Sequence, residues 1–241
     1  MSQVAARTPS ELEVLALIEK SGLTEKAAAA VYFSFSDLES FVAAHDPGGR
    51  ITRLIEFLPL PVRGAELLGA IASVDDSGPR LVANYEQRMP ELYAAVDHFY
   101  EDEEPAETES LAWLLGAASL TIGLDQPDLD RALHPSLVGV KLDTVVIERD
   151  GRYLFDGRRF LRSLISYRIG DVPKDVLARS MFESLADFAV DAVRRLVTEW
   201  KADAIVCAGD LFAGNNILRV RTRGGLIALR LPLHFSPVAR S

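Results

Sequence analysis

The stretch "IVCAGDLFAGNNILRVRTRGG", residues 205–225, decides the expected fold. Its apolar start ends at a small-residue turn, Ala208-Gly209-Asp210, and the triplet Gly214-Asn215-Asn216 follows. A turn of this kind after a strand can direct backbone N–H groups at an anion, and glycine allows the anion to approach closely. An ordinary strand-to-helix turn has the same spacing and is the commoner case. The pattern alone leaves both interpretations open.

The residues before this stretch predict alternating strands and helices. Apolar side chains at spacings of three and four predict a long helix from Pro173 to about Trp200. Asp156 is placed to cap a helix that ends near Tyr167. The alternating stretch before that helix contains a hairpin turn at 149–152, because Asp-Gly tolerates positive φ.

Three short segments complete this half. Residues 204–208 predict a buried strand, 215–220 a helix or a second extended piece, and 226–231 a final strand. If the chain is extended from Arg219 to Arg223, the arginines at 219, 221 and 223 share one face of the strand. The order of hairpin, helix, long helix, strand, turn and strand predicts an α/β fold with a mixed sheet.

The amino-terminal half is predicted to be mostly helical. Residues 8–45 are expected to form short helices, the first starting at Thr8-Pro9. Residues 51–60 predict a strand, and 64–71 and 80–100 predict helices, the second divided at Pro90.

The acidic stretch 97–109 has no apolar period and is the best candidate for a boundary. The sequence therefore predicts a helix-rich acidic region, 1–105, and an α/β region, 106–241. Charge supports the division, since residues 1–139 hold 9 basic and 23 acidic side chains, net −14, and the rest hold 17 and 12, net +5. This balance disfavours nucleic acid as a partner.

Composition excludes several other classes. One cysteine, Cys207, cannot form an internal disulfide and is expected to be a small core residue. No signal peptide and no membrane-spanning stretch are predicted, so a cytoplasmic location is expected. No metal site is predicted, because the four histidines of the chain do not converge on a recognisable motif.

The segment from about Val145 to Arg240 resembles the second half of the carbamoyltransferase domain in the HypF family of nickel–iron hydrogenase maturation proteins. "FDGRRFLRSLI", "LARSMFESLADFAVDAV" and "CAGDLFAGNN" lie alongside three elements of that domain, the last being "Leu-Ser-Gly-Gly-Val-Phe-x-Asn". The resemblance implies an actin-like fold of the sugar-kinase and Hsc70 superfamily (ASKHA, ribonuclease H-like) for the carboxyl-terminal half.

The sequence departs from the family at informative places. Glu183 stands where the family has a helix histidine, and Asp210 replaces the second glycine of the pair that begins at Gly209. A carboxylate there would repel a phosphate unless a metal intervened. Asn215 lies one residue after the family asparagine, with Gly214 at the aligned place, and a His-x-x-x-His pair is absent. The resemblance therefore indicates a reduced, degenerate relative.

Three functional hypotheses follow. The first is an accessory protein of metalloenzyme maturation, acting through contacts with a maturation factor or a hydrogenase subunit. The second is an active nucleotide-dependent carbamoyl- or related transferase, using ATP with Mg²⁺, in which Gly209 and Asp210 approach the phosphate and Gly214, Asn215 and Asn216 complete the site. The third treats the resemblance as a coincidence of α/β patterning.

Overall fold

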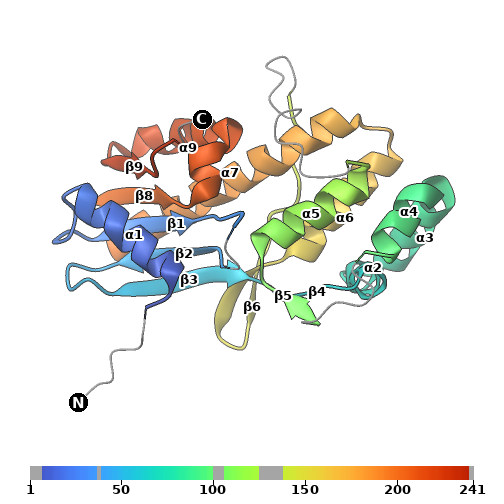
Figure 1. Ribbon diagram of the computed structural model, residues 1–241, viewed down its shortest axis with the longest axis horizontal. Helices are drawn as coiled ribbons and strands as arrows, with labels where there is room; N and C mark the ends of the chain where they lie inside the picture. The colour runs from blue at the N-terminus through green and yellow to red at the C-terminus, as the bar shows by residue number, and fades with distance from the viewer. Residues whose placement is uncertain (1–6, 37–38, 100–105, 125–137, 239–241) are drawn as a thin grey trace.

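The chain is organised by one mixed sheet of seven strands. The computed structural model describes residues 7–36, 39–99, 106–124 and 138–238 (Figure 1). The strands are β1 (Ala28–Tyr32), β2 (Phe41–His45), β3 (Ile51–Phe57), β6 (Val146–Arg149), β7 (Arg152–Phe155), β8 (Ala204–Ala208) and β9 (Leu233–Phe235). Their order is β6-β7-β3-β2-β1-β8-β9. Pairs β1–β8, β8–β9 and β3–β7 are parallel, and the other three are antiparallel. The expected α/β class with a mixed sheet is confirmed.

Helices cover both faces of this sheet. They are α1 (Pro9–Lys20), α2 (Gly64–Ala72), α3 (Gly78–Arg88), α4 (Pro90–Asp97), α5 (Leu111–Ile122), α6 (Gly157–Ile169), α7 (Lys174–Trp200), α8 (Asp210–Gly214) and α9 (Asn216–Leu226), with a 3₁₀ turn at Ile227–Leu229. A separate two-stranded ribbon pairs β4 (Leu60–Pro61) with β5 (Glu107–Thr108). In Figure 1, α2 to α6 gather beside the sheet, and α1 and α7 lie across its two faces.

Local signals in the sequence account for several of these elements. Thr8 and Glu11 form a capping box at the start of α1. Asp150 and Gly151 have φ values of 53° and 72°, as a tight β-hairpin turn requires. Asp156 caps α6 by accepting a hydrogen bond from the N–H of Arg158.

Residues 28–45 form two strands instead of the expected helices. All five residues of β1 and all five of β2 are buried. Alanine favours helix by intrinsic propensity, but here small side chains allow helices to pack closely on both faces of a central strand. Tertiary packing thus overrides the helical preference of this alanine-rich segment.

The carboxyl-terminal end also differs from expectation. Residues 226–231 contain the end of α9 and the 3₁₀ turn, and the last strand is β9, which begins at Leu233. Because residues 216–226 are helical, the arginines at 219, 221 and 223 do not share one face of a strand. Arg219 instead donates to the carbonyls of Phe212 and Ser236.

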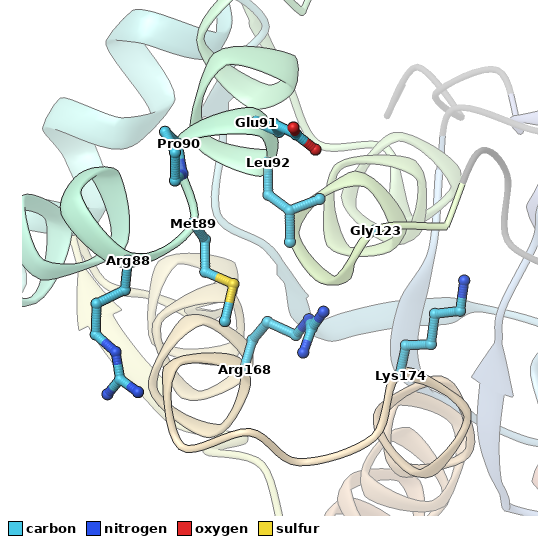
Figure 2. Close-up of a pocket in the computed structure, with 8 residues that line it drawn as sticks. All are labelled: Arg88, Met89, Pro90, Glu91, Leu92, Gly123, Arg168 and Lys174. Carbon is cyan, nitrogen blue, oxygen red and sulfur yellow. The ribbon is translucent and has the colours of Figure 1, made fainter.

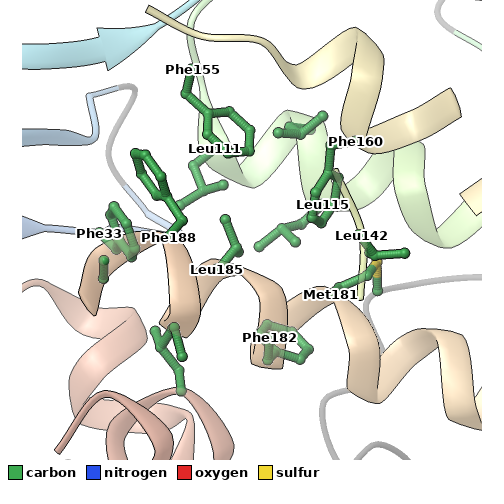
Figure 3. Close-up of a cluster of buried hydrophobic side chains, with 14 of the residues drawn as sticks. Phe33, Leu111, Leu115, Leu142, Phe155, Phe160, Met181, Phe182, Leu185 and Phe188 are labelled. Atoms are coloured by element: carbon green, nitrogen blue, oxygen red, sulfur yellow. The ribbon is translucent and has the colours of Figure 1, made fainter. Parts of the chain in front are cut away.

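Alternation along the central strands divides the buried side chains into two layers. Ala28, Ala30 and Tyr32 pack with α1, whereas Ala29 and Val31 belong to the larger core that contains α7. Figure 3 shows part of that larger core, in which Phe188 of α7 lies between Phe33 and Phe155. The ring centroids are 6.2 Å apart for Phe33–Phe188 and 4.9 Å for Phe155–Phe188.

The sheet and the larger core both take residues from each side of position 105. Strands β1 to β3 precede it and β6 to β9 follow it. The pairing of β1 with β8 joins the two predicted regions at the centre of the sheet. Within the described residues, no helix is both long and apolar enough to cross a membrane.

Candidate functional site

Gly209 lies at the carboxyl end of β8, where the chain turns into α8. Its φ is 100° and its ψ 158°, a conformation that is essentially restricted to glycine. A Cβ at this position would lie 2.1 Å from the carbonyl oxygen of Phe33. That oxygen accepts a hydrogen bond from Leu211 N–H, and Phe33 N–H donates to Ala208. The glycine is therefore required by the close approach of the residue after β1.

The N–H of Gly209 is occupied by groups of the chain itself. It donates to Glu13 Oε1 at 3.3 Å and to Ser236 Oγ at 3.2 Å. Glu13 belongs to α1, and its other carboxylate oxygen accepts a hydrogen bond from the Tyr32 hydroxyl at 3.0 Å. A carboxylate thus lies against the N–H that the sequence predicted for an external anion.

Asp210 makes the same kind of contact with the loop that follows β1. Its two carboxylate oxygens accept hydrogen bonds from the N–H groups of Phe35, at 2.6 Å, and Ser36, at 3.0 Å. Two consecutive backbone N–H groups form a small anion-binding concavity. In this structure the anion is the side chain of Asp210. The residue that was expected to repel a phosphate occupies donors that a phosphate could use.

The remaining three predicted site residues form the junction of α8 and α9. Asn215 is buried, and its Oδ1 caps α9 by accepting a hydrogen bond from Leu218 N–H at 2.8 Å. Its Nδ2 is buried and has no hydrogen-bond partner among the described residues. Gly214 and Asn216 are exposed. The structure therefore divides the five residues into a pair that contacts the loop after β1 and a triplet that caps a helix.

Sequence reasoning missed the residues that complete this arrangement. Glu13, Phe35, Ser36 and Ser236 come from α1, the loop after β1 and the segment after β9. Asp210 and Phe35 are 175 residues apart in the chain, so no local spacing connects them. Only the parallel pairing of β1 with β8 brings the two loops together, and the sequence had predicted helix at β1.

Glu183, at the place of the family's helix histidine, forms ion pairs with two arginines. Its carboxylate lies 2.6 Å from Arg179 Nε and 3.2 Å from a terminal nitrogen of Arg221. It also accepts a hydrogen bond from Gly139 N–H at 3.3 Å. The side chain therefore connects α7 to α9 and to the segment that begins at residue 138.

Other predicted features are located as follows. Cys207 is fully buried in β8, and burial raises the pKa of its thiol far above the ordinary range, so it is a core residue without a reactive thiolate. In the described parts of the chain, no three His, Cys, Asp or Glu side chains are grouped to hold a metal ion. Residues 100–105 of the acidic stretch predicted as a boundary, and His134, lie outside the described residues.

Comparisons with known proteins match the chain to HydE by sequence and to HypF by structure. No family model matches the chain. Protein HydE of Wolinella succinogenes is 23% identical over 202 residues, covering 78% of this chain and 35% of HydE. A crystal structure of full-length HypF in its phosphate- and nucleotide-bound form superposes with a TM-score of 0.69 at 14% identity, over 94% of this chain and 32% of HypF. HypF of T. kodakarensis gives 0.63 at 14% identity, over 95% and 33%.

The chain thus has a fold that is found within HypF. It spans about a third of the length of the relatives it matches. The expected resemblance to HypF is confirmed at the level of fold, and it extends further than expected. The sequence motifs covered the carboxyl-terminal half, whereas the structural likeness covers 94% of the chain, because β1 to β3 belong to the same sheet as β8.

Proposed function

We propose that this chain is an accessory protein of nickel–iron hydrogenase maturation, descended from a carbamoyltransferase domain like that of HypF. It acts in the cytoplasm by contacting a maturation factor or a hydrogenase subunit, and neither nucleic acid nor a membrane is its partner. Support comes from the shared fold over 94% of the chain and from the match to HydE over 78% of it. Sequence identities this low support common ancestry but not a shared function. The proposed non-catalytic role therefore rests on the local geometry of the site.

One observation carries the non-catalytic role. Two carboxylates of the chain occupy the backbone N–H groups at the predicted phosphate site. Glu13 accepts a hydrogen bond from Gly209 N–H, and Asp210 accepts hydrogen bonds from the N–H groups of Phe35 and Ser36. A nucleotide phosphate would have to displace these carboxylates while remaining close to their charge. Like charges at a few ångströms repel by several kcal/mol where water is partly excluded, so the arrangement opposes phosphate binding.

The sequence adds a second argument. The chain contains no His-x-x-x-His pair, and Glu183, at the place of the family's helix histidine, is already held by two arginines. A metal-dependent transferase requires a convergent set of ligands. In this proposal the fold was retained while its chemistry was lost.

A second function, an ATP- and Mg²⁺-dependent carbamoyl- or related transferase, is favoured by one feature. Asn215 Nδ2 is a buried donor without a partner among the described residues, and a ligand could supply the missing acceptor. In this alternative Gly209 and Asp210 would approach a nucleotide phosphate, with Mg²⁺ offsetting the charge of the Asp210 carboxylate, and Asn215 or Asn216 would orient the nucleotide. Catalysis would then rest on positioning and electrostatics.

Calorimetry with ATP and Mg²⁺ separates the two functions. We expect no binding heat from the wild-type protein at millimolar nucleotide. Asp203→Ala removes an exposed carboxylate just before β8 and is the matched control. Binding by the wild type and by Asp203→Ala that Asp210→Ala abolishes would overturn the accessory role and support the transferase.

Affinity purification from native cells tests the partner. The tagged chain is expected to recover a hydrogenase-maturation factor or a hydrogenase subunit in stoichiometric amount, at low and at moderate salt. Recovery of unrelated proteins alone would contradict the proposed role in maturation, even if the calorimetry showed no nucleotide binding.

A further inference from the structure

A second candidate site lies among the helices beside the sheet, away from Gly209 and Asp210. It is a pocket of about 440 Å³ at the junction of α3 with α4, bounded by the ends of α5 and α6 and the start of α7 (Figure 2). Pockets that bind small organic molecules have volumes of about 300–1,000 Å³. None of the residues that line it belongs to the predicted phosphate site.

The charges that line this pocket do not balance. Three cations, Arg88, Arg168 and Lys174, line it together with a single carboxylate, that of Glu91. Arg88 has an exposed partner, Asp171, at 3.5 Å. The side chains of Arg168 and Lys174 have no ion pair or hydrogen bond with any residue in the described part of the chain, and Arg168 Nε is buried there without a partner. A buried guanidinium nitrogen without an acceptor is costly, so the pocket favours a ligand that supplies one.

Helix dipoles do not change this balance. α4 and α7 begin at the pocket, while α3, α5 and α6 end there. The positive partial charges at two helix starts are more than offset by the negative partial charges at three helix ends. The excess positive charge therefore comes from the side chains of Arg168 and Lys174.

An apolar wall lies beside these cations. Figure 2 shows Met89 and Leu92 projecting into the pocket on the side of Arg168, with Lys174 across from them and the Glu91 carboxylate beyond Leu92. Leu92 packs against the end of α5, where a Cβ on Gly123 would lie 3.1 Å from a Leu92 methyl carbon. The wall is thus fixed by packing and can receive the apolar part of a ligand.

We propose that this pocket binds a small organic anion, with a phosphate-ester or carboxylate group on an aromatic or aliphatic body. Arg168 and Lys174 hold the anionic group, and Met89 and Leu92 contact the body. The proposal is independent of the maturation role, because it involves neither the residues nor the ligand of the Gly209 site.

Amide NMR titration tests the binding. Phenyl phosphate and benzoate are the two anionic probes, and benzyl alcohol is a neutral probe of similar shape. Both anions are expected to shift amide signals of residues 88–92, 123, 168 and 174 at millimolar concentration, and to shift them less at high salt, which screens the charges. No shift at these residues, or an equal shift with benzyl alcohol, would overturn the proposal. The probe that binds more tightly distinguishes a phosphate ligand from a carboxylate ligand.

Single charge removals provide the second test. Arg168→Gln and Lys174→Gln should each weaken binding roughly tenfold, as expected for the loss of one hydrogen bond between charged groups. Arg223→Gln removes an exposed charge on α9 and should leave affinity unchanged. Lys174 is the first residue of α7, so its replacement tests binding even if Arg168→Gln fails to fold. Unchanged affinity in Lys174→Gln would contradict the assignment of that cation.

Discussion

Replacing Gly209 by alanine tests the close contact between the ends of β1 and β8. The new Cβ would lie 2.1 Å from the Phe33 carbonyl oxygen, where ordinary contacts begin at 3.4 Å, so the two backbones must separate by more than 1 Å. The φ of 100° adds strain of about 1–3 kcal/mol for any residue with a Cβ. Separation also weakens the hydrogen bonds Phe33 N–Ala208 O and Leu211 N–Phe33 O, each contributing about 1 kcal/mol net.

The free energy of unfolding is therefore expected to fall by about 3–5 kcal/mol, a large part of the 5–15 kcal/mol typical of native proteins. Urea denaturation followed by circular dichroism measures the change. Gly214→Ala is the matched control, because Gly214 ends α8 with nothing within 4 Å of the added Cβ. It should be neutral, or stabilising by about 0.5 kcal/mol. Equal unfolding midpoints for the two variants would refute the argument.

Three further predictions concern charge and reactivity. Glu183→Ala should destabilise by about 1–3 kcal/mol, because it removes a buried carboxylate that pairs with Arg179 and Arg221, although Arg221 keeps its pair with Asp187. Asp191→Ala, in an exposed pair, should cost less than about 0.5 kcal/mol in the same urea assay. Burial raises the pKa of Glu39, but hydrogen bonds from Arg53, Ser10 and Thr8 lower it more, so it lies below the ordinary 4.5. The lowered pKa contributes to the free energy of unfolding. This stabilisation is present above about pH 4.5 and is lost as the pH falls through the lowered pKa. In Glu39→Gln the free energy of unfolding should fall less steeply as the pH is lowered below about 4.5. An unchanged slope would count against the hydrogen bonds from Arg53, Ser10 and Thr8 to Glu39. Cys207, fully buried with a pKa raised by burial, should react with a thiol reagent only as fast as the protein unfolds, so rapid labelling of the native protein would disagree with its position.

Much of the fold could be predicted because it is encoded locally. The capping box at Thr8, the Asp-Gly hairpin, the Asp156 cap and the apolar period of α7 each lie within a few residues of the structure they specify. Local signals failed at β1, where four consecutive alanines indicate helix unless the two covering helices are known. That information comes from residues 9–20 and 174–200, which are distant in the sequence.

The candidate site shows the same limit. Residues 209, 210 and 214–216 were predicted as a site from a local pattern and a family resemblance, and Asp210 was noted as a departure from the family's glycine pair. Its hydrogen-bond acceptor role toward Phe35 and Ser36 could not be predicted, because the contact depends on which strands are neighbours. Strand order is a property of the whole chain, and a single sequence gives little access to it.

The pairing of β1 with β8 also determines when the sheet can be completed during synthesis. Ala28 pairs with Ala204, 176 residues later, since 204 minus 28 is 176. At the usual 5–20 residues per second, β1 would emerge roughly 9–35 s before β8, its parallel partner strand. During that interval one edge of β1 has no neighbour, and open strand edges are sites of aggregation. A chain of this topology therefore exposes a strand edge that can aggregate while it is still attached to the ribosome.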